Sequence, residues 1–335
     1  MTSAADLLPY QRLHLKSFTY SALDAGPSLI VLGAVHGNED CGTKAIARVM
    51  AELDSGALHL QRGRITFVPI TNPLAFEKQQ RNGDRNLNRN LRVTDEPLDF
   101  EDRIANALCP LLADHDVLLD LHSTNNPGEA FIMLGPENNQ GDLQPFTHAE
   151  QEEALAVRLG PHRIVEGWLC TYAEGVKHRL AYTPQCERSH LLNTDPSYGV
   201  GTTEYMRAHG GYSLTLECGQ HADISSPEVA YQGIRNAIAC LQLADVPAAP
   251  VQTDIEFLKI SRVIDRHHAD DVFVKTWSSF DPVQAGEVIG VRHDGQQELA
   301  PCDGFVLFPN PSAVPGNEWF YFAQLSERQL SALKE

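Results

Sequence analysis

The stretch SLIVLGAVHGNE (residues 28–39) decides the fold class. Residues 29–35 are apolar or small, without the polar alternation of a half-exposed strand, and such runs are typical of strands in a parallel sheet that is covered on both faces. Similar runs recur at residues 64–69, 116–121 and 212–217, and helical patterns lie between them. Strands that alternate with helices predict an α/β domain.

The pattern changes after the stretch DVPAAP (residues 245–250), whose composition is typical of a linker. Residues 251–335 carry short strand-like runs that glycines interrupt, and little helical pattern. This composition favours a small all-β barrel or sandwich. We therefore expect two domains, residues 1–245 and residues 251–335.

Charge and composition exclude several classes of partner. The 335 residues include 26 Lys and Arg against 44 Asp and Glu, a net charge of −18, which is the opposite sign from most nucleic-acid or anionic-membrane binders. No apolar run is long enough to cross a bilayer, and residues 1–6 show no basic segment followed by an apolar one. The seven cysteines, Cys186 among them, include no C-x-x-C pair. We expect a cytoplasmic protein with reduced thiols and no nucleic-acid or membrane partner.

Metal-ligating residue types follow two of the predicted strands. His36 and Glu39 come directly after the first strand, and His122 follows the strand at residues 116–121. Because parallel strands bring their carboxyl ends to one edge of a sheet, these side chains could meet there. Two histidines and a glutamate form an open zinc site with a position left for water and substrate. The alternative is that they are ordinary polar residues at the starts of loops.

Two acidic residues lie on the same strands. Asp120 precedes His122 by two positions, so strand alternation turns both to one side, and Asp120 could orient the histidine. Glu217 ends an apolar strand, where burial would raise its pKa and suit it to proton transfer. A solvated acid or a strand-end ion pair is the alternative for either residue.

A basic segment at residues 78–92 stands out in this acidic chain. Arg81, Arg85, Arg89 and Arg92 have helical spacing, which allows a solvated helix face. Four asparagines and an Asn-Gly pair in the same segment favour a structured loop instead. A cationic loop predicts binding of a small carboxylate.

Taken together, the motifs resemble the succinylglutamate desuccinylase/aspartoacylase family, whose catalytic domain has the zinc carboxypeptidase fold. The matching motifs are H-G-N-E at residues 36–39, T-N-P at 71–73, L-N-R at 87–89, D-L-H at 120–122 and E-C-G at 217–219. The resemblance implies a mixed sheet flanked by helices in a catalytic domain, residues 1–245, and a covering domain of the biotinyl/lipoyl barrel-sandwich type, residues 251–335. The chain departs from the family's pattern at Asn86, where the family usually has Asp.

The resemblance also implies roles for individual residues. His36, Glu39 and His122 would hold one Zn²⁺ per chain. Glu217 would act as the base and Arg81 would polarise the scissile carbonyl. Asn88 and Arg89 would bind the α-carboxylate, and Arg207, ten residues before Glu217, would bind a second carboxylate. The segment around Tyr321 resembles one that places a tyrosine near the substrate, although a core aromatic is the alternative.

We therefore expect a zinc-dependent deacylase that cleaves the amide bond of a small N-acyl amino acid of the N-acetyl-aspartate or N-succinyl-glutamate type. Two alternatives stay open: a zinc carboxypeptidase acting on short peptides, and a catalytically silent carboxylate-binding protein. The sequence leaves the acyl group and the oligomeric state open, a homo-oligomer included.

Overall fold

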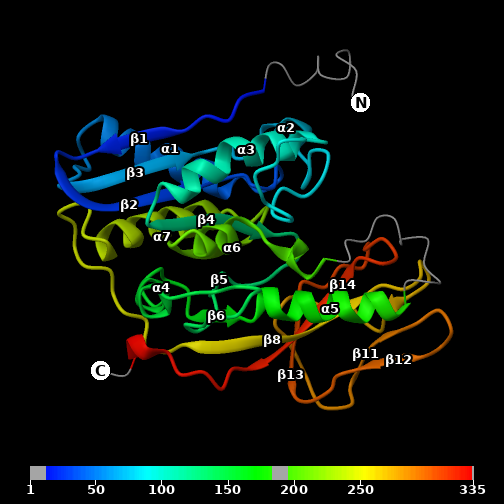
Figure 1. Cartoon of the computed structure of the whole chain (residues 1–335). Coiled ribbons are helices and arrows are strands. Elements are labelled where there is room, and N and C mark those ends of the chain that lie inside the picture. The colour runs from blue at the N-terminus through cyan, green and yellow to red at the C-terminus, as the bar shows by residue number, and fades with distance from the viewer. Residues whose placement is uncertain (1–12, 183–194, 334–335) are drawn as a thin grey trace.

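The predicted apolar strands form the centre of a large mixed sheet in the computed structural model (Figure 1). The model describes residues 13–182 and 195–333; Met1–Asp6 and Cys186 lie outside these ranges. The sheet has 11 strands. In spatial order they are β1 (Phe18–Ser21), β3 (Arg62–Val68), β2 (Asp24–Leu32), β4 (Val117–Thr124), β7 (Tyr212–Gln220), β5 (Phe131–Met133), β6 (Arg163–Glu166), β8 (Glu256–Asp265), β14 (Glu318–Leu325), β13 (Gly304–Leu307) and β10 (Asp281–Val283).

The four predicted strands are neighbours and run parallel, in the order β3, β2, β4 and β7. Every residue of β4 is buried, which explains why its sequence shows no polar alternation. Burial on both faces requires helices on both sides. The helices are α1 (Cys41–Asp54), α2 (Pro73–Lys78), α3 (Phe100–Ala113), α4 (Ala149–Ala156), α5 (Trp168–Tyr182), α6 (Thr202–Ala208) and α7 (Ser226–Cys240), with short 3₁₀ turns at Pro196–Gly199 and Ser331–Leu333.

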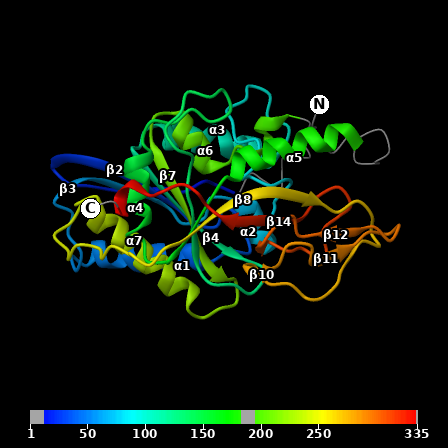
Figure 2. The same ribbon diagram turned by 90° about the horizontal axis from the view of Figure 1, so that it is seen from below.

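Two hydrophobic cores lie on opposite faces of the sheet. Along β4, Leu119 and Leu121 belong to the core that α1 and α7 cover, whereas Leu118 belongs to the core that α3 and α6 cover. Figure 2 shows α1 and α7 on one side of the sheet and α3 and α6 on the other. The alternation therefore turns Asp120 and His122 to the side of α6.

The C-terminal strands extend the main sheet. β8 pairs in parallel with β6, and β14, β13 and β10 continue from it in antiparallel order. A separate three-stranded sheet is formed by β12 (Gln297–Leu299), β11 (Val288–Val291) and β9 (Val272–Phe273). The predicted fold class, a mixed sheet flanked by helices with an all-β C-terminal region, is confirmed; the division into two domains stays a prediction.

None of the helices in the described ranges has the length and apolar character needed to span a membrane.

Candidate metal and substrate site

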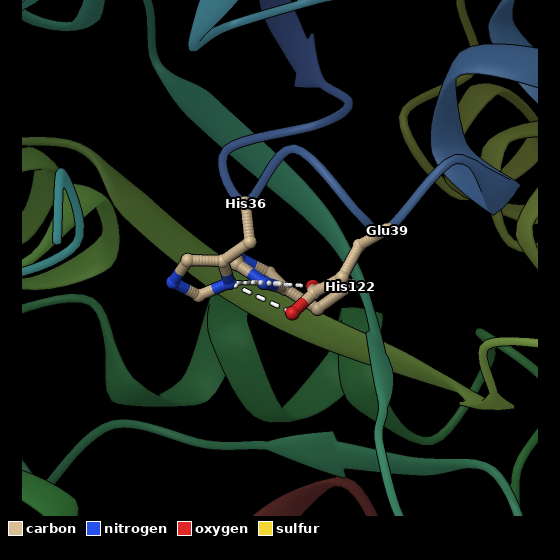
Figure 3. A group of neighbouring side chains, drawn as sticks. All are labelled: His36, Glu39 and His122. Carbon is tan, nitrogen blue, oxygen red and sulfur yellow. Dashed lines mark hydrogen bonds and ion pairs between the residues drawn. The ribbon is translucent and has the colours of Figure 1, made fainter. Parts of the chain in front are cut away.

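Three predicted metal ligands converge where β2 and β4 end (Figure 3). Nδ1 of His36 lies 2.9 Å from one carboxylate oxygen of Glu39, and Nδ1 of His122 lies 2.8 Å from the other. The two Nδ1 atoms are 3.2 Å apart. All three side chains are buried, and one ligand atom from each falls within 4.8 Å of the others.

This donor set fits a divalent cation. Two imidazole nitrogens that face each other across 3.2 Å, with a carboxylate beside both, form the kind of two-His, one-Glu tripod that binds zinc. Burial, assisted by the charge of Arg81, lowers the pKa of His36 to about 4, so this ring is neutral at pH 7. Burial acts against a charge on His122, but Asp120 and Glu39 outweigh it and raise its pKa well above the ordinary value. A cation that enters the site would therefore displace a proton.

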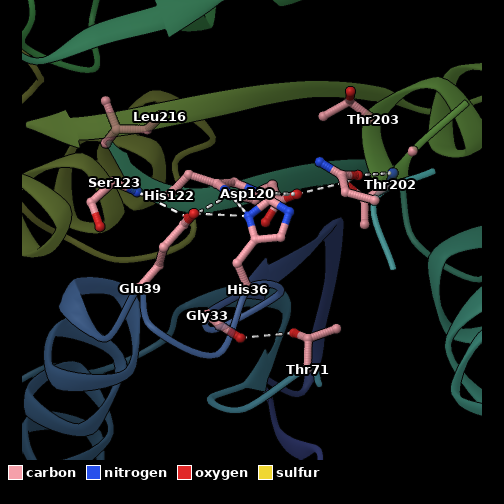
Figure 4. Close-up of polar contacts among 12 residues, drawn as sticks. Gly33, His36, Glu39, Thr71, Asp120, His122, Ser123, Thr202, Thr203 and Leu216 are labelled. Atoms are coloured by element: carbon pink, nitrogen blue, oxygen red, sulfur yellow. Dashed lines mark hydrogen bonds and ion pairs between the residues drawn. The ribbon is translucent and has the colours of Figure 1, made fainter. Parts of the chain in front are cut away.

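The remaining nitrogen of each histidine faces an oxygen acceptor. Nε2 of His122 lies 3.0 Å from Oδ2 of Asp120, and that oxygen also accepts a hydrogen bond from the hydroxyl of Thr202 (Figure 4). Nε2 of His36 lies 3.1 Å from Oδ1 of Asn86. Acceptors of this kind fix which nitrogen faces the metal. The acceptor that faces His122 is thus an acid, Asp120, and the one that faces His36 is a neutral amide, Asn86.

The loop from β2 to α1 is held tightly against its neighbours. Thr71 donates a hydrogen bond from its hydroxyl to the carbonyl oxygen of Gly33 (2.9 Å; Figure 4). A Cβ atom at Gly37 would overlap the carbonyl carbon of Ala75, which accounts for the glycine in the H-G-N-E motif. These contacts fix the backbone between the two ligands of the loop.

Glu217 stands next to the metal ligands. It pairs with His122 in the register of β4 and β7, and its Oε2 atom is buried with no hydrogen-bond partner in residues 13–182 and 195–333. Burial, partly offset by His122, raises the pKa of Glu217 to about 7. A carboxylate with this pKa can accept a proton near neutral pH and return it.

The basic segment is a structured loop, as predicted. The carboxylate of Glu101, in the first turn of α3, accepts hydrogen bonds from the backbone N–H groups of Gly83, Asp84 and Arg85. It also accepts one from the side chain of Asn72, at 2.9 Å. In the sequence, Glu101 is marked only as an acidic residue at the start of a helix.

The loop presents three of the predicted residues to the site. Arg81 donates from Nη1 to Glu39 (2.9 Å) and is half exposed. Oδ1 of Asn88 accepts a hydrogen bond from the backbone N–H of Thr202 (2.9 Å). The guanidinium of Arg89 lies 4.5 Å above the ring of Trp168 and forms no ion pair with a carboxylate in the described part of the chain.

Arg207 lies deeper, on α6. Its Nε and Nη2 atoms each donate to Glu152 at 2.9 Å, and Nη2 also donates to the carbonyl oxygen of Ser213. The structure therefore places Arg207 near the other predicted residues but already bound to a buried carboxylate.

One cavity of about 450 Å³ joins these residues. Its walls include His36, His122, Glu217, Arg81, Asn88, Arg89 and Arg207. The C-terminal region closes part of it with Phe308, Glu318 and Tyr321. Tyr321 is buried, and its hydroxyl oxygen is buried without a hydrogen-bond partner in the described part of the chain. Tyr321 thus belongs to the cavity wall, as the resemblance of its segment implied.

Ser123 and His221 form a further polar pair at the cavity. The Ser123 hydroxyl and Nδ1 of His221 are 2.8 Å apart, and the backbone N–H of Ser123 donates to Glu39 (3.2 Å). Ser123 and His221 are 98 positions apart, so no local pattern in the sequence indicates this pair, and only the sheet brings them together.

The fold and the donor set together define a class: α/β proteins that can hold a divalent cation between His and Glu side chains at the carboxyl ends of parallel strands. Residues 25–156 match the model of the succinylglutamate desuccinylase/aspartoacylase catalytic domain. The resemblance to that family, predicted from the motifs, is thus confirmed. No curated protein sequence matches the chain.

Solved structures share the fold over almost the whole chain. The succinylglutamate desuccinylase/aspartoacylase from Rhodobacter sphaeroides is 17% identical, with a TM-score of 0.68, and the match covers 94% of this chain and 90% of that one. The ectoine utilization protein from Ruegeria pomeroyi, in a product-bound structure, is 19% identical, with a TM-score of 0.65 and coverage of 92% and 88%. An aspartoacylase family protein from Mesorhizobium loti is 22% identical, with a TM-score of 0.62 and coverage of 94% and 90%.

Proposed function

We propose that this protein is a zinc-dependent hydrolase that cleaves the amide bond of an N-acyl amino acid. One observation carries the proposal: the His36–Glu39–His122 group shares a cavity with Glu217, a half-buried residue whose Oε2 atom is buried without a hydrogen-bond partner among the described residues. Three metal ligands beside such a carboxylate can provide an activated water and a general base, which are the groups that amide hydrolysis requires. The family match over residues 25–156 supports the same reaction class.

Glu217 provides the proton transfer. A zinc ion held by His36, Glu39 and His122 would supply a Lewis acid and lower the pKa of a bound water to about 7. Glu217 accepts a proton from the attacking water, and then donates it to the nitrogen of the leaving amine. Its pKa of about 7 allows both steps near neutral pH.

The arginines orient the substrate. Arg81 reaches Glu39 with Nη1, which leaves its other N–H groups for the carbonyl oxygen as negative charge develops there. Arg89 stacks on Trp168 and has no ion-pair partner among the described residues. Its Nη1 atom donates to the carbonyl oxygen of Asn88, and its remaining N–H groups offer a planar pair of donors to the α-carboxylate. Such two-point binding is specific for a carboxylate.

The cavity also bears on the rival functions. A carboxypeptidase needs room for a peptide that continues beyond the scissile bond, whereas Phe308 and Tyr321 of the C-terminal region line this cavity of about 450 Å³. These walls from the C-terminal region narrow the cavity, which favours a small N-acyl amino acid. A silent binding protein would have no need for a Glu217 side chain whose Oε2 atom is buried without a hydrogen-bond partner among the described residues, because such an atom lowers stability.

Amine release from N-acetyl, N-formyl and N-succinyl amino acids, with a dipeptide series in parallel, tests the proposal. We expect release from at least one N-acyl amino acid by the zinc-loaded protein, and none by the Glu217→Gln variant at matched zinc content. Faster cleavage of dipeptides would favour the carboxypeptidase, and the absence of any release by protein with bound zinc would favour the binding protein.

A further inference from the structure

The guanidinium of Arg207 is anchored inside the protein through its Nε and Nη2 atoms. Two of its N–H groups bind the carboxylate of Glu152 side by side, at 2.9 Å each, and a third contact reaches the carbonyl oxygen of Ser213 at 2.8 Å. The side chains of Arg207 and Glu152 are only 3% and 1% exposed. A two-point pair buried to this degree is among the strongest charged contacts a protein forms.

The last nitrogen of Arg207 also faces an acid. Nη1 lies 3.6 Å from Oε1 of Glu204, three residues earlier on α6. Glu204 is itself held by the backbone N–H of Gly201 at 2.9 Å, and it lines the cavity next to Arg207. The cluster of Arg207, Glu152 and Glu204 thus has a formal charge of −1, and Glu204 is the acid of this cluster that lines the cavity.

Backbone hydrogen bonds and close packing hold the Arg207–Glu152 pair in place. Glu152 accepts hydrogen bonds from the backbone N–H groups of Gly135 (2.6 Å) and Ser213 (2.9 Å) as well as from Arg207. A Cβ atom at Gly135 would overlap both the guanidinium and the carboxylate. To release Arg207 toward a ligand would leave the Glu152 carboxylate buried without its counter-charge, which is strongly unfavourable.

The two other arginines that line the cavity are held less firmly by carboxylates than Arg207 is. Arg81 is paired with Glu39 beside the metal ligands. Arg89 has no carboxylate partner in the described ranges and stacks on Trp168. The free N–H groups of Arg81 lie beside the metal ligands, where the reacting carbonyl would bind. Away from those ligands, Arg89 is the arginine of this cavity that can give a substrate carboxylate two donors.

We infer that the cavity accepts only one substrate carboxylate, and that the substrate is an N-acyl amino acid whose remaining groups are neutral or positively charged. The inference deepens the proposed function and rests on it. Arg207 is a positioning residue that holds Glu152 and Glu204, and Glu204 excludes a second carboxylate by repulsion. The sequence predicts that Arg207 binds a second substrate carboxylate; we infer instead a preference for substrates that lack a second carboxylate. Repulsive groups of this kind often set specificity.

Three substrates of similar size distinguish a preference for one carboxylate from a preference for two. They are N-acetyl-glutamate, N-acetyl-glutamine and N-acetyl-ornithine. For the zinc-loaded enzyme we expect kcat/KM to be at least about tenfold higher for the neutral and cationic substrates than for the dicarboxylate. Glu204→Gln should reduce that ratio at least about fivefold by improving N-acetyl-glutamate alone. Glu150→Gln, an exposed residue on α4, is the matched control and should leave the ratio unchanged.

Binding of the free product amino acids, measured by calorimetry on the zinc-loaded protein, gives a readout that needs no turnover. We expect glutamine and ornithine to bind more tightly than glutamate, and Glu204→Gln to narrow the gap. A wild-type preference for N-acetyl-glutamate, or an unchanged ratio in a folded Glu204→Gln variant, would overturn the inference and leave the proposed hydrolase intact. If no N-acyl amino acid is cleaved, the proposed function fails, and equal binding of the three products would overturn the inference separately.

Discussion

His122 and Glu217 occupy matching positions on the adjacent parallel strands β4 and β7. The sheet register therefore places an imidazole that could bind a metal and a half-buried carboxylate next to each other on the face that α6 covers. Both strands are internal to the sheet, so the spacing of these two groups depends on backbone pairing and is rigid. The same pairing sets Asp120, which faces His122, opposite Thr215.

Glu217→Gln should abolish most of the activity while leaving the metal in place. The amide keeps the shape of the side chain but cannot accept the proton of the attacking water, so we expect kcat to fall by about 10²- to 10⁴-fold. Zinc content by mass spectrometry should match that of the wild type. Glu228→Gln, on the exposed surface of α7, is the control and should lose nothing. A Glu217→Gln variant that retains kcat would remove this residue from the reaction.

The same residue should make the metal-free protein less stable as the pH rises. Burial raises the pKa of Glu217 to about 7, above the value it has in an unfolded chain. The folded state therefore binds the proton of Glu217 more tightly than the unfolded chain does. Protonation of Glu217 contributes to the free energy of unfolding below about pH 4.5, and this contribution is lost as the pH rises through 7. Glu217→Gln should be more stable than the wild type at pH 8 by on the order of 3 kcal/mol, and similar at pH 4. Urea unfolding of both proteins after metal removal measures the difference, and an equal difference at the two pH values would contradict it.

Asn86→Asp should strengthen metal binding. Oδ1 of Asn86 faces Nε2 of His36 at 3.1 Å, and a charged acceptor at this position makes the ring a better electron donor to the metal. We expect zinc affinity, measured by competition with a chromophoric chelator, to rise up to about tenfold. Asn86→Ala should lower it by about tenfold to a hundredfold. If both variants bind zinc as the wild type does, this asparagine has no part in orienting His36.

Arg89→Lys should weaken substrate binding despite keeping the charge. An ammonium group cannot offer the two parallel donors of the guanidinium, nor stack in the same way on Trp168, which lies 4.5 Å away. We expect KM for the N-acyl amino acid to rise about tenfold or more with a smaller change in kcat. A loss confined to kcat would indicate that Arg89 acts on the reacting carbonyl instead of the carboxylate.

The sequence predicts much of the centre of the molecule, for a physical reason. Strands buried on both faces must be apolar throughout, so β2 and β4 stand out in the sequence, and polar residues at their carboxyl ends mark the site. His36, Glu39 and His122 are therefore predictable as a group. Glu217 is predictable because an acid that ends an apolar strand requires an explanation.

Other features depend on pairing between distant segments, which leaves no local pattern. Glu152 and Arg207 are 55 positions apart, and nothing in either neighbourhood indicates that one neutralises the other. The prediction that Arg207 binds a substrate carboxylate took no account of such a partner. Likewise, residues 251–335 look separate in composition, yet β8 pairs with β6 and extends the main sheet.

Zinc titration of the metal-free protein, with amine release from an N-acyl amino acid as the readout, tests the proposed hydrolase most directly. We predict that activity rises linearly with added zinc and reaches its plateau at one equivalent per chain, and that His122→Ala stays inactive throughout. Activity that is independent of zinc, or full activity in the His122→Ala variant, would contradict a hydrolytic centre built on His36, Glu39 and His122.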